Sequence, residues 1–215
     1  MKKTVFKSRD ENKDMIRNVR KSMISPEKLM SSSDMARVGC NGCEGCCECC
    51  KNRGSSITLD SWDVSQLKDG LNRGFQELVD NGFIVLEPVN GVILPVLGKK
   101  RTADECIFLG EDGRCRIHPF RPGICRMFPL ARLYHEDGSF SYFLQEGECE
   151  RPNGVKIKIS KWLEIRNITE YEKAVRSYHD RLVELRNALA ESDDSETAAK
   201  LQKQFLIRNF LYSPL

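Results

Sequence analysis

Six cysteines lie within eleven residues in the segment CNGCEGCCECC, residues 40–50. Thiolates are soft donors that suit tetrahedral Zn²⁺ and iron–sulfur clusters. A C-x2-C step lets two sulfurs reach one metal ion or two neighbouring irons. The segment contains overlapping steps of this kind, namely Cys40/Cys43, Cys43/Cys46, Cys46/Cys49 and Cys47/Cys50. The whole chain has only three histidines, so sulfur is the metal donor that this sequence offers.

Downstream cysteines extend the set. Cys106, Cys115 and Cys125 lie in the segment CIFLGEDGRCRIHPFRPGIC, each near a predicted turn or strand end, and Cys149 follows a predicted hairpin. Adjacent cysteines such as Cys49 and Cys50 point apart, so the 40–50 segment cannot complete a site alone. We therefore expect the distant cysteines to converge on this segment around bound metal.

Disulfides are the competing explanation, because ten cysteines in a secreted chain would indicate a disulfide framework. The first residues, MKKTVFKSRDENK, are basic and lack the apolar core of a secretory signal. No apolar run approaches the roughly 20 residues of a membrane span. We expect a cytoplasmic protein with reduced thiols, and neighbouring cysteines also bridge one another poorly.

Basic residues flank the downstream cysteines. A site with four thiolates is anionic, and its burial needs N–H donors or opposing charge. Arg121 and Arg126 lie among prolines and cysteines, and we expect them to donate to sulfur or to oppose its charge. Over the whole chain, 34 basic residues nearly balance 31 acidic ones, for a net charge of +3, so a nucleic-acid partner is not expected.

Apolar spacing predicts the elements that must position these cysteines. Residues 57–82 indicate one or two short helices, broken near Gly70–Gly74. Two β-branched runs joined by Asn90-Gly91 predict a hairpin over 83–98, and a second hairpin is predicted around Asp137-Gly138. A tighter turn is predicted at Asp112-Gly113.

The C-terminal part is helical and contains no cysteine from Ile159 onward. Thr169 is the predicted cap of a long helix, whose apolar seam recurs at 4-3-4-3-4 spacing at Tyr171, Val175, Tyr178, Leu182, Leu185 and Leu189. ESDDS breaks it, and a final helix is predicted over residues 198–210. We expect this pair to pack on the rest of the chain, and a dimerisation helix is the alternative.

The sequence thus predicts an α+β fold, a small loop-rich cysteine-cluster domain with short β-hairpins and helices, followed by a C-terminal antiparallel helix pair. Three parts are expected: a polar N-terminal lead-in (1–39), a metal-binding domain (40–158) and a helical appendage (159–215).

The cysteine pattern resembles the YkgJ-type cysteine-cluster family, a zinc- or iron-chelating domain marked by C-x2-C-x2-C-C. The later motifs of that family are C-x-[FL]-L, G-x-C-x-I, R-P and C-R-x-F-P. These stand here as CIFL at 106, GRCRI at 113, RP at 121 and CRMFP at 125.

The resemblance implies a ligand set. The first motif fits twice, as Cys40, Cys43, Cys46 and Cys47 or as Cys43, Cys46, Cys49 and Cys50, and we favour the second because its double cysteine directly precedes Lys51. The implied ligands are then Cys43, Cys46, Cys49, Cys50, Cys106, Cys115, Cys125 and Cys149, with Cys40 as a possible addition.

Three functions follow from the pattern. The first is a metal-binding protein that holds an iron–sulfur cluster, of the 4Fe-4S type, or Zn²⁺. The second comes from a similarity to flagellin lysine N-methylases, which implies a cluster, S-adenosylmethionine and a protein substrate. No GxGxxG lies between a strand and a helix, so a Rossmann-type methyltransferase is not expected. The third is a structural zinc module that presents its helices to a partner.

Overall fold

The computed structural model describes residues 28–39, 47–51, 57–101, 104–145, 149 and 155–211. Cys40, Cys43 and Cys46 lie outside the described residues, as does most of the predicted N-terminal lead-in.

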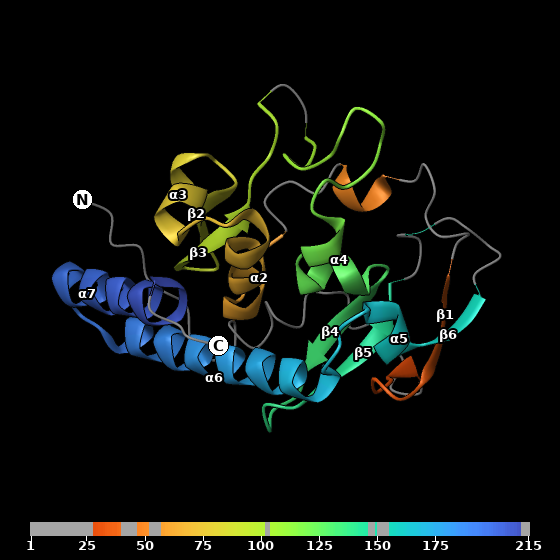
Figure 1. Ribbon diagram of the computed structural model, residues 1–215. Coiled ribbons are helices and arrows are strands. Elements are labelled where there is room, and N and C mark those ends of the chain that lie inside the picture. Colours follow the sequence, from red (N-terminus) through yellow and green to blue (C-terminus); the bar gives the residue numbers. More distant parts are fainter. Residues whose placement is uncertain are drawn as a thin grey trace.

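The fold is a mixture of helices and short antiparallel sheets, which confirms the predicted α+β class (Figure 1). Each of the three sheets has two strands: β1 (Met35–Gly39) with β6 (Val155–Lys158), β2 (Ile84–Val89) with β3 (Val92–Leu97), and β4 (Leu130–Tyr134) with β5 (Phe140–Leu144). The helices are α2 (Ser61–Leu71), α3 (Phe75–Asp80), α4 (Gly123–Met127), α5 (Ile159–Leu163), α6 (Ile168–Glu191) and α7 (Ser195–Leu206). Shorter turns are the 3-10 helices η3 (Glu48–Cys50) and η4 (His118–Phe120) and a π-helical turn, η5 (Ile207–Leu211).

Both predicted hairpins are present. Asn90 and Gly91 join β2 to β3 with φ values of 50° and 79°, the left-handed pair that a tight hairpin turn requires. Gly138, at φ 79°, turns the chain between β4 and β5. Each strand is an edge of its own sheet, which is why Pro88 and Pro95 are tolerated.

The two predicted short helices of the 57–82 region are α2 and α3. Asp60 caps α2, and its side chain accepts the backbone N–H of Asp63 while the Asp63 side chain accepts that of Asp60, a reciprocal capping box. The helix ends at Asn72, which is left-handed at φ 51°. The predicted break near Gly70–Gly74 is confirmed, because the last residue of α2 is Leu71 and Gly74 caps α3. Gly70 is the second-last residue of α2, and a Cβ there would lie 2.3 Å from the ring of Phe120.

The long C-terminal helix follows its predicted seam. Tyr171, Val175, Tyr178, Leu182 and Leu185 are buried along α6. The predicted cap at Thr169 is wrong, because Asn167 caps the helix by accepting the backbone N–H of Glu170. The chain breaks at 192–194, and α7 packs back against α6.

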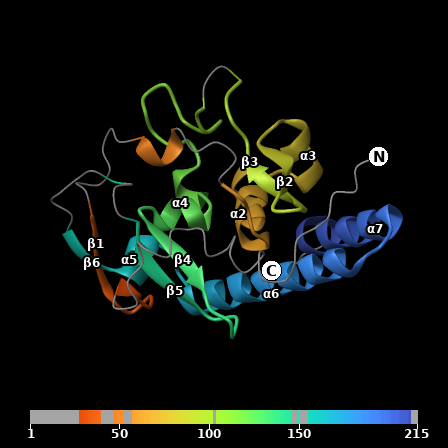
Figure 2. The same cartoon turned by 180° about the vertical axis from the view of Figure 1, so that it is seen from behind.

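Buried side chains form two clusters. One joins α2, α3 and the β2–β3 hairpin to α6, α7 and η5. The other joins the β1–β6 sheet to the β4–β5 hairpin, α4 and α5. In both views α6 runs along one side of the molecule and passes both halves (Figures 1 and 2). The C-terminal helices are therefore part of the folded body, and Phe210 at the end of η5 is 1% exposed.

The β1–β6 sheet ties together distant parts of the chain. Gly39 pairs with Val155 and Met35 with Lys158. β1, which leads into the 40–50 segment, is therefore held beside β6, which begins six residues after Cys149. Residues 35–39 are part of a sheet, while the boundary of the predicted lead-in at residue 39 stays a prediction.

Within the part of the chain that the structure describes, no helix is both long enough and apolar enough to cross a membrane.

Candidate metal centre

Backbone pairing places Cys50 beside Cys106. The N–H of Cys106 donates to the carbonyl of Cys50 at 2.8 Å, and Lys51 forms an antiparallel bridge with Glu105. The side chains of Lys51 and Glu105 also approach, with Nζ and Oε1 3.9 Å apart. The η3 turn is thereby fixed against a segment more than fifty residues downstream in the printed sequence.

The predicted turn at Asp112-Gly113 brings Cys115 to the same place. Gly113 has a φ of 75°, and the N–H of Gly110 donates to the carbonyl of Arg114 at 2.8 Å. Leu109 and Cys115 then form an antiparallel bridge. The turn reverses the chain so that Cys115 lies next to Cys50 and Cys106.

The thiols themselves are in contact. Cys50 Sγ lies 3.8 Å from Cys49 Sγ, and the side chains of Cys106 and Cys115 lie near enough to raise the pKa of Cys50. The backbone N–H of Phe108 donates to Cys106 Sγ at 3.4 Å. These contacts bring four sulfurs from three separate segments together. None of the seven cysteines that the structure describes forms a disulfide.

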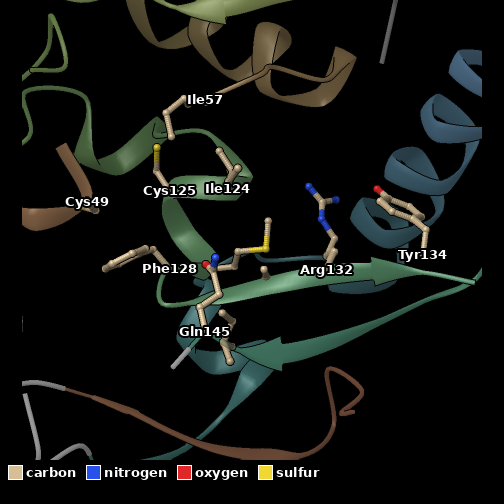
Figure 3. Close-up of a pocket in the computed structure, with 11 residues that line it drawn as sticks. Cys49, Ile57, Ile124, Cys125, Phe128, Arg132, Tyr134 and Gln145 are labelled. Atoms are coloured by element: carbon tan, nitrogen blue, oxygen red, sulfur yellow. The ribbon is translucent and has the colours of Figure 1, made fainter. Parts of the chain in front are cut away.

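Cys125 reaches this cluster from α4. Figure 3 shows its side chain near Ile57, with Cys49 close by on η3. Cys49, Cys106 and Cys115 lie near enough for their charges to act on the Cys125 thiol. Burial is the main cause of the raised pKa of Cys125.

Hydrogen bonding at Cys50 controls the other thiols. The interaction with Cys106 and Cys115 raises the pKa of Cys50 and lowers the pKa of both partners. The pKa of Cys115 falls to about 6, and the Ile117 N–H and the charge of Arg121 contribute. Thiolates are the form that binds metal. The arrangement therefore already stabilises negative charge on two of its sulfurs.

The residues of α4 are positioned from two sides. Asp63 Oδ1 accepts the backbone N–H of Gly123 at 2.6 Å. Gly123 also has no room for a side chain, because a Cβ would meet the hydroxyl of Tyr171 on α6. Asp63 was not identified from the sequence as a site residue. The D-S-W-D capping pattern at residues 60–63 was the available signal.

Arg126 has a different set of contacts from the expected donation to sulfur. Its guanidinium donates to the backbone carbonyls of Pro119, Arg121, Leu163 and Glu164. With 5% of the residue exposed, Arg126 fastens the RPGIC segment to α5. Donation from Arg126 to sulfur stays a prediction. Arg121 lies 3.6 Å from the Glu164 carboxylate and favours the Cys115 thiolate through its charge.

The structure thus brings together Cys49, Cys50, Cys106, Cys115 and Cys125. Cys149 is half-buried beyond β5, and its participation stays a prediction, as does that of the undescribed Cys40, Cys43 and Cys46. Among the described residues, no group of three or more Cys, His, Asp or Glu side chains has the spacing of a finished metal site. The donor chemistry nevertheless fits zinc or iron, since sulfurs from separate segments touch without bridging covalently.

An α+β chain in which five of the described cysteines converge from separate segments without disulfides has the features of a cysteine-rich chelating domain. The comparison with known families agrees. Residues 40–163 match the family CxxCxxCC, described as a "putative zinc- or iron-chelating domain". The match covers more than half of the 215-residue chain, and the protein belongs to this family.

No curated protein and no solved structure matches the chain significantly.

Proposed function

We propose that the protein holds an iron–sulfur cluster through its converging cysteines, with a zinc ion as the competing occupant. The observation that carries the proposal is the gathering of four cysteines: Cys50 Sγ contacts Cys49 Sγ, the Cys106 backbone pairs with Cys50, and Cys106 and Cys115 both act on the pKa of Cys50. Thiols held at this spacing in a reduced protein are either metal ligands or a redox pair, and contact among more than two sulfurs favours metal.

The proposed ligands begin with the five described cysteines that converge. Cys43, Cys46 and Cys149 complete the set from segments that lead directly into or out of the same region. A bound 4Fe-4S cluster would supply one-electron transfer, whereas zinc would join the segments without redox chemistry. Arg121 supports either occupant by opposing the thiolate charge.

Metal and sulfide analysis of protein purified without oxygen tests the proposal. We expect brown protein with a broad visible absorbance, bound iron and acid-labile sulfide in matching amounts. Colourless protein with stoichiometric zinc would show that zinc, and not a cluster, is the occupant. That result would favour a structural zinc module. Protein that contains neither metal, even after anaerobic reconstitution with iron and sulfide, would end the proposal.

A second candidate is cluster-dependent methylation of protein lysines with S-adenosylmethionine. The feature that favours it is a pocket of about 480 Å³ that opens beside Cys49 and Cys125, because a catalyst needs room for substrate next to its cofactor. Reduced, cluster-loaded protein with labelled S-adenosylmethionine and a lysine-rich acceptor protein should then transfer label. Absence of transfer from the loaded protein would leave metal binding as the function.

A further inference from the structure

The pocket beside the cysteines has two chemically different ends. Cys49 and Cys125 lie at one side, and Arg132 and Tyr134 from β4 lie at the other (Figure 3). Between them the lining is apolar and comes from Ile57, Ile124, Met127, Phe128, Leu130 and Ala131. Gln145, which directly follows β5, also lines the pocket. At about 480 Å³, the pocket is large enough for a small organic molecule.

Arg132 has an unmet hydrogen-bonding need. Its side chain is 11% exposed, and its Nη2 lies 3.9 Å from Asp60 Oδ2. Its Nη1 is buried and has no hydrogen-bond partner among the described residues. A buried donor without an acceptor costs about 1–3 kcal/mol, so an acceptor oxygen supplied by a ligand would bind favourably here.

The charge around Arg132 argues against an anionic ligand. Asp60 and Asp63 are both buried, and the charge of Arg132 acts on both. The Asp60 carboxylate, 3.9 Å from Arg132 Nη2, already matches the positive charge of this guanidinium. A carboxylate in the pocket would therefore add an unbalanced buried negative charge, which is costly. A neutral oxygen acceptor avoids this cost.

We propose that this pocket binds a neutral, largely apolar molecule whose amide or ketone carbonyl accepts a hydrogen bond from Arg132. The apolar body fills the space between β4 and α4, and the remaining end approaches Cys49 and Cys125. The inference deepens the proposed function and rests on it in one respect, because these two cysteines belong both to the pocket and to the metal centre.

A matched pair of probes tests the ligand class. 3-Phenylpropanamide and 3-phenylpropanoate have the same shape, and only the second carries a charge. Each is titrated into the full-length protein as purified, with binding measured by ligand-observed NMR. We expect a millimolar dissociation constant for the amide, as is usual for a molecule of this size, and at least about tenfold weaker binding of the carboxylate.

Two variants locate the binding. Ala131→Leu places a larger side chain in the lining without altering Arg132, and it should weaken amide binding at least about tenfold. Leu133→Met on the same strand lies outside the lining and should leave the dissociation constant within about twofold. Equal or tighter binding of the carboxylate, no amide binding, or an unchanged constant in Ala131→Leu would overturn the inference.

Elemental analysis of the same samples separates the two proposals. Protein that contains metal but does not bind the amide refutes the pocket assignment alone. Protein that lacks metal but binds the amide with the expected selectivity refutes the metal centre alone.

Discussion

Asp63 on α2 and Gly123 on α4 are joined by a 2.6 Å hydrogen bond across sixty residues of sequence. The bond runs from the backbone N–H of Gly123 to a carboxyl group that also closes the capping box of α2. Cys125 lies two residues further along α4. The position of this cysteine therefore depends on a carboxyl group of α2.

The ionisation of Asp63 should make stability fall as pH rises. Burial, followed by the charge of Asp60, raises the pKa of Asp63 from 3.8 to about 8. The folded protein thus keeps a proton that the unfolded chain releases, and stability is lost between these two pH values, by at most about 1.4 kcal/mol per pH unit. Asp63→Asn removes this titration, so its free energy of unfolding relative to wild type should rise steadily between pH 4 and 8.

Urea unfolding of both proteins at several pH values measures this difference. Asp137→Asn is a suitable control, because hydrogen bonds from Ser139 lower the pKa of that exposed carboxyl. Its stabilising effect is present above the unfolded pKa and is lost only as pH falls, so the difference between this control and wild type should stay constant between about pH 5 and 8 and shrink only at more acidic pH. A pH-independent difference between Asp63→Asn and wild type would contradict the raised pKa.

Cys125→Ser should lose most of the bound metal, because serine cannot replace a buried thiolate donor. Folding and metal binding are coupled in small metal domains, so the variant should also unfold at lower urea concentration. Cys47→Ser should retain metal if Cys43, Cys46, Cys49 and Cys50 form the first motif. The metal-to-protein ratios of the two purified variants distinguish the two registers. Equal loss of metal from both would show that the first motif is instead formed by Cys40, Cys43, Cys46 and Cys47.

Arg126→Met should lower the free energy of unfolding by about 3 kcal/mol, because buried carbonyls lose a charged donor. Arg116 provides a matched control. It is exposed, and its guanidinium donates to the carbonyl of Ile107 at 2.8 Å. Arg116→Met should cost less than about 1 kcal/mol in the same urea titration. Similar losses in the two variants would show that the carbonyl contacts of Arg126 contribute little.

Gly70→Ala should destabilise the protein by about 2 kcal/mol, although alanine is the better helix former, because the added methyl group collides with Phe120. In a Phe120→Ala background the collision is absent. There Gly70→Ala should be neutral or stabilising by up to about 1 kcal/mol. The double-mutant cycle, measured by thermal or urea unfolding, reports the contact directly, and additive effects would argue against it.

Local patterns predicted the elements well where a local cause decides them. Asn90-Gly91 demands left-handed backbone and so marks its hairpin, and the spacing from Tyr171 to Leu185 marks the buried face of α6. The cap at Asn167 was missed because Thr169 and Asn167 are both good capping residues, and sequence alone does not rank them here.

Tertiary contacts account for what was not predicted. The collision that a side chain at Gly70 would make with Phe120 involves a residue fifty positions away and leaves no sequence pattern. The carbonyls of residues 163 and 164 that accept from Arg126 are distant in sequence and were not predicted, while its donation to sulfur stays a prediction. The convergence of distant cysteines was predicted from their chemistry, but the pairing of Lys51 with Glu105 that accomplishes it leaves no sequence pattern.

The pairing of Gly39 with Val155 has a consequence for the residues that lie between them. The chain arrives at the chelating segment and departs from it at adjacent points. A single proteolytic cleavage between these strands therefore leaves two fragments that are still joined by the hydrogen bonds of the β1–β6 sheet.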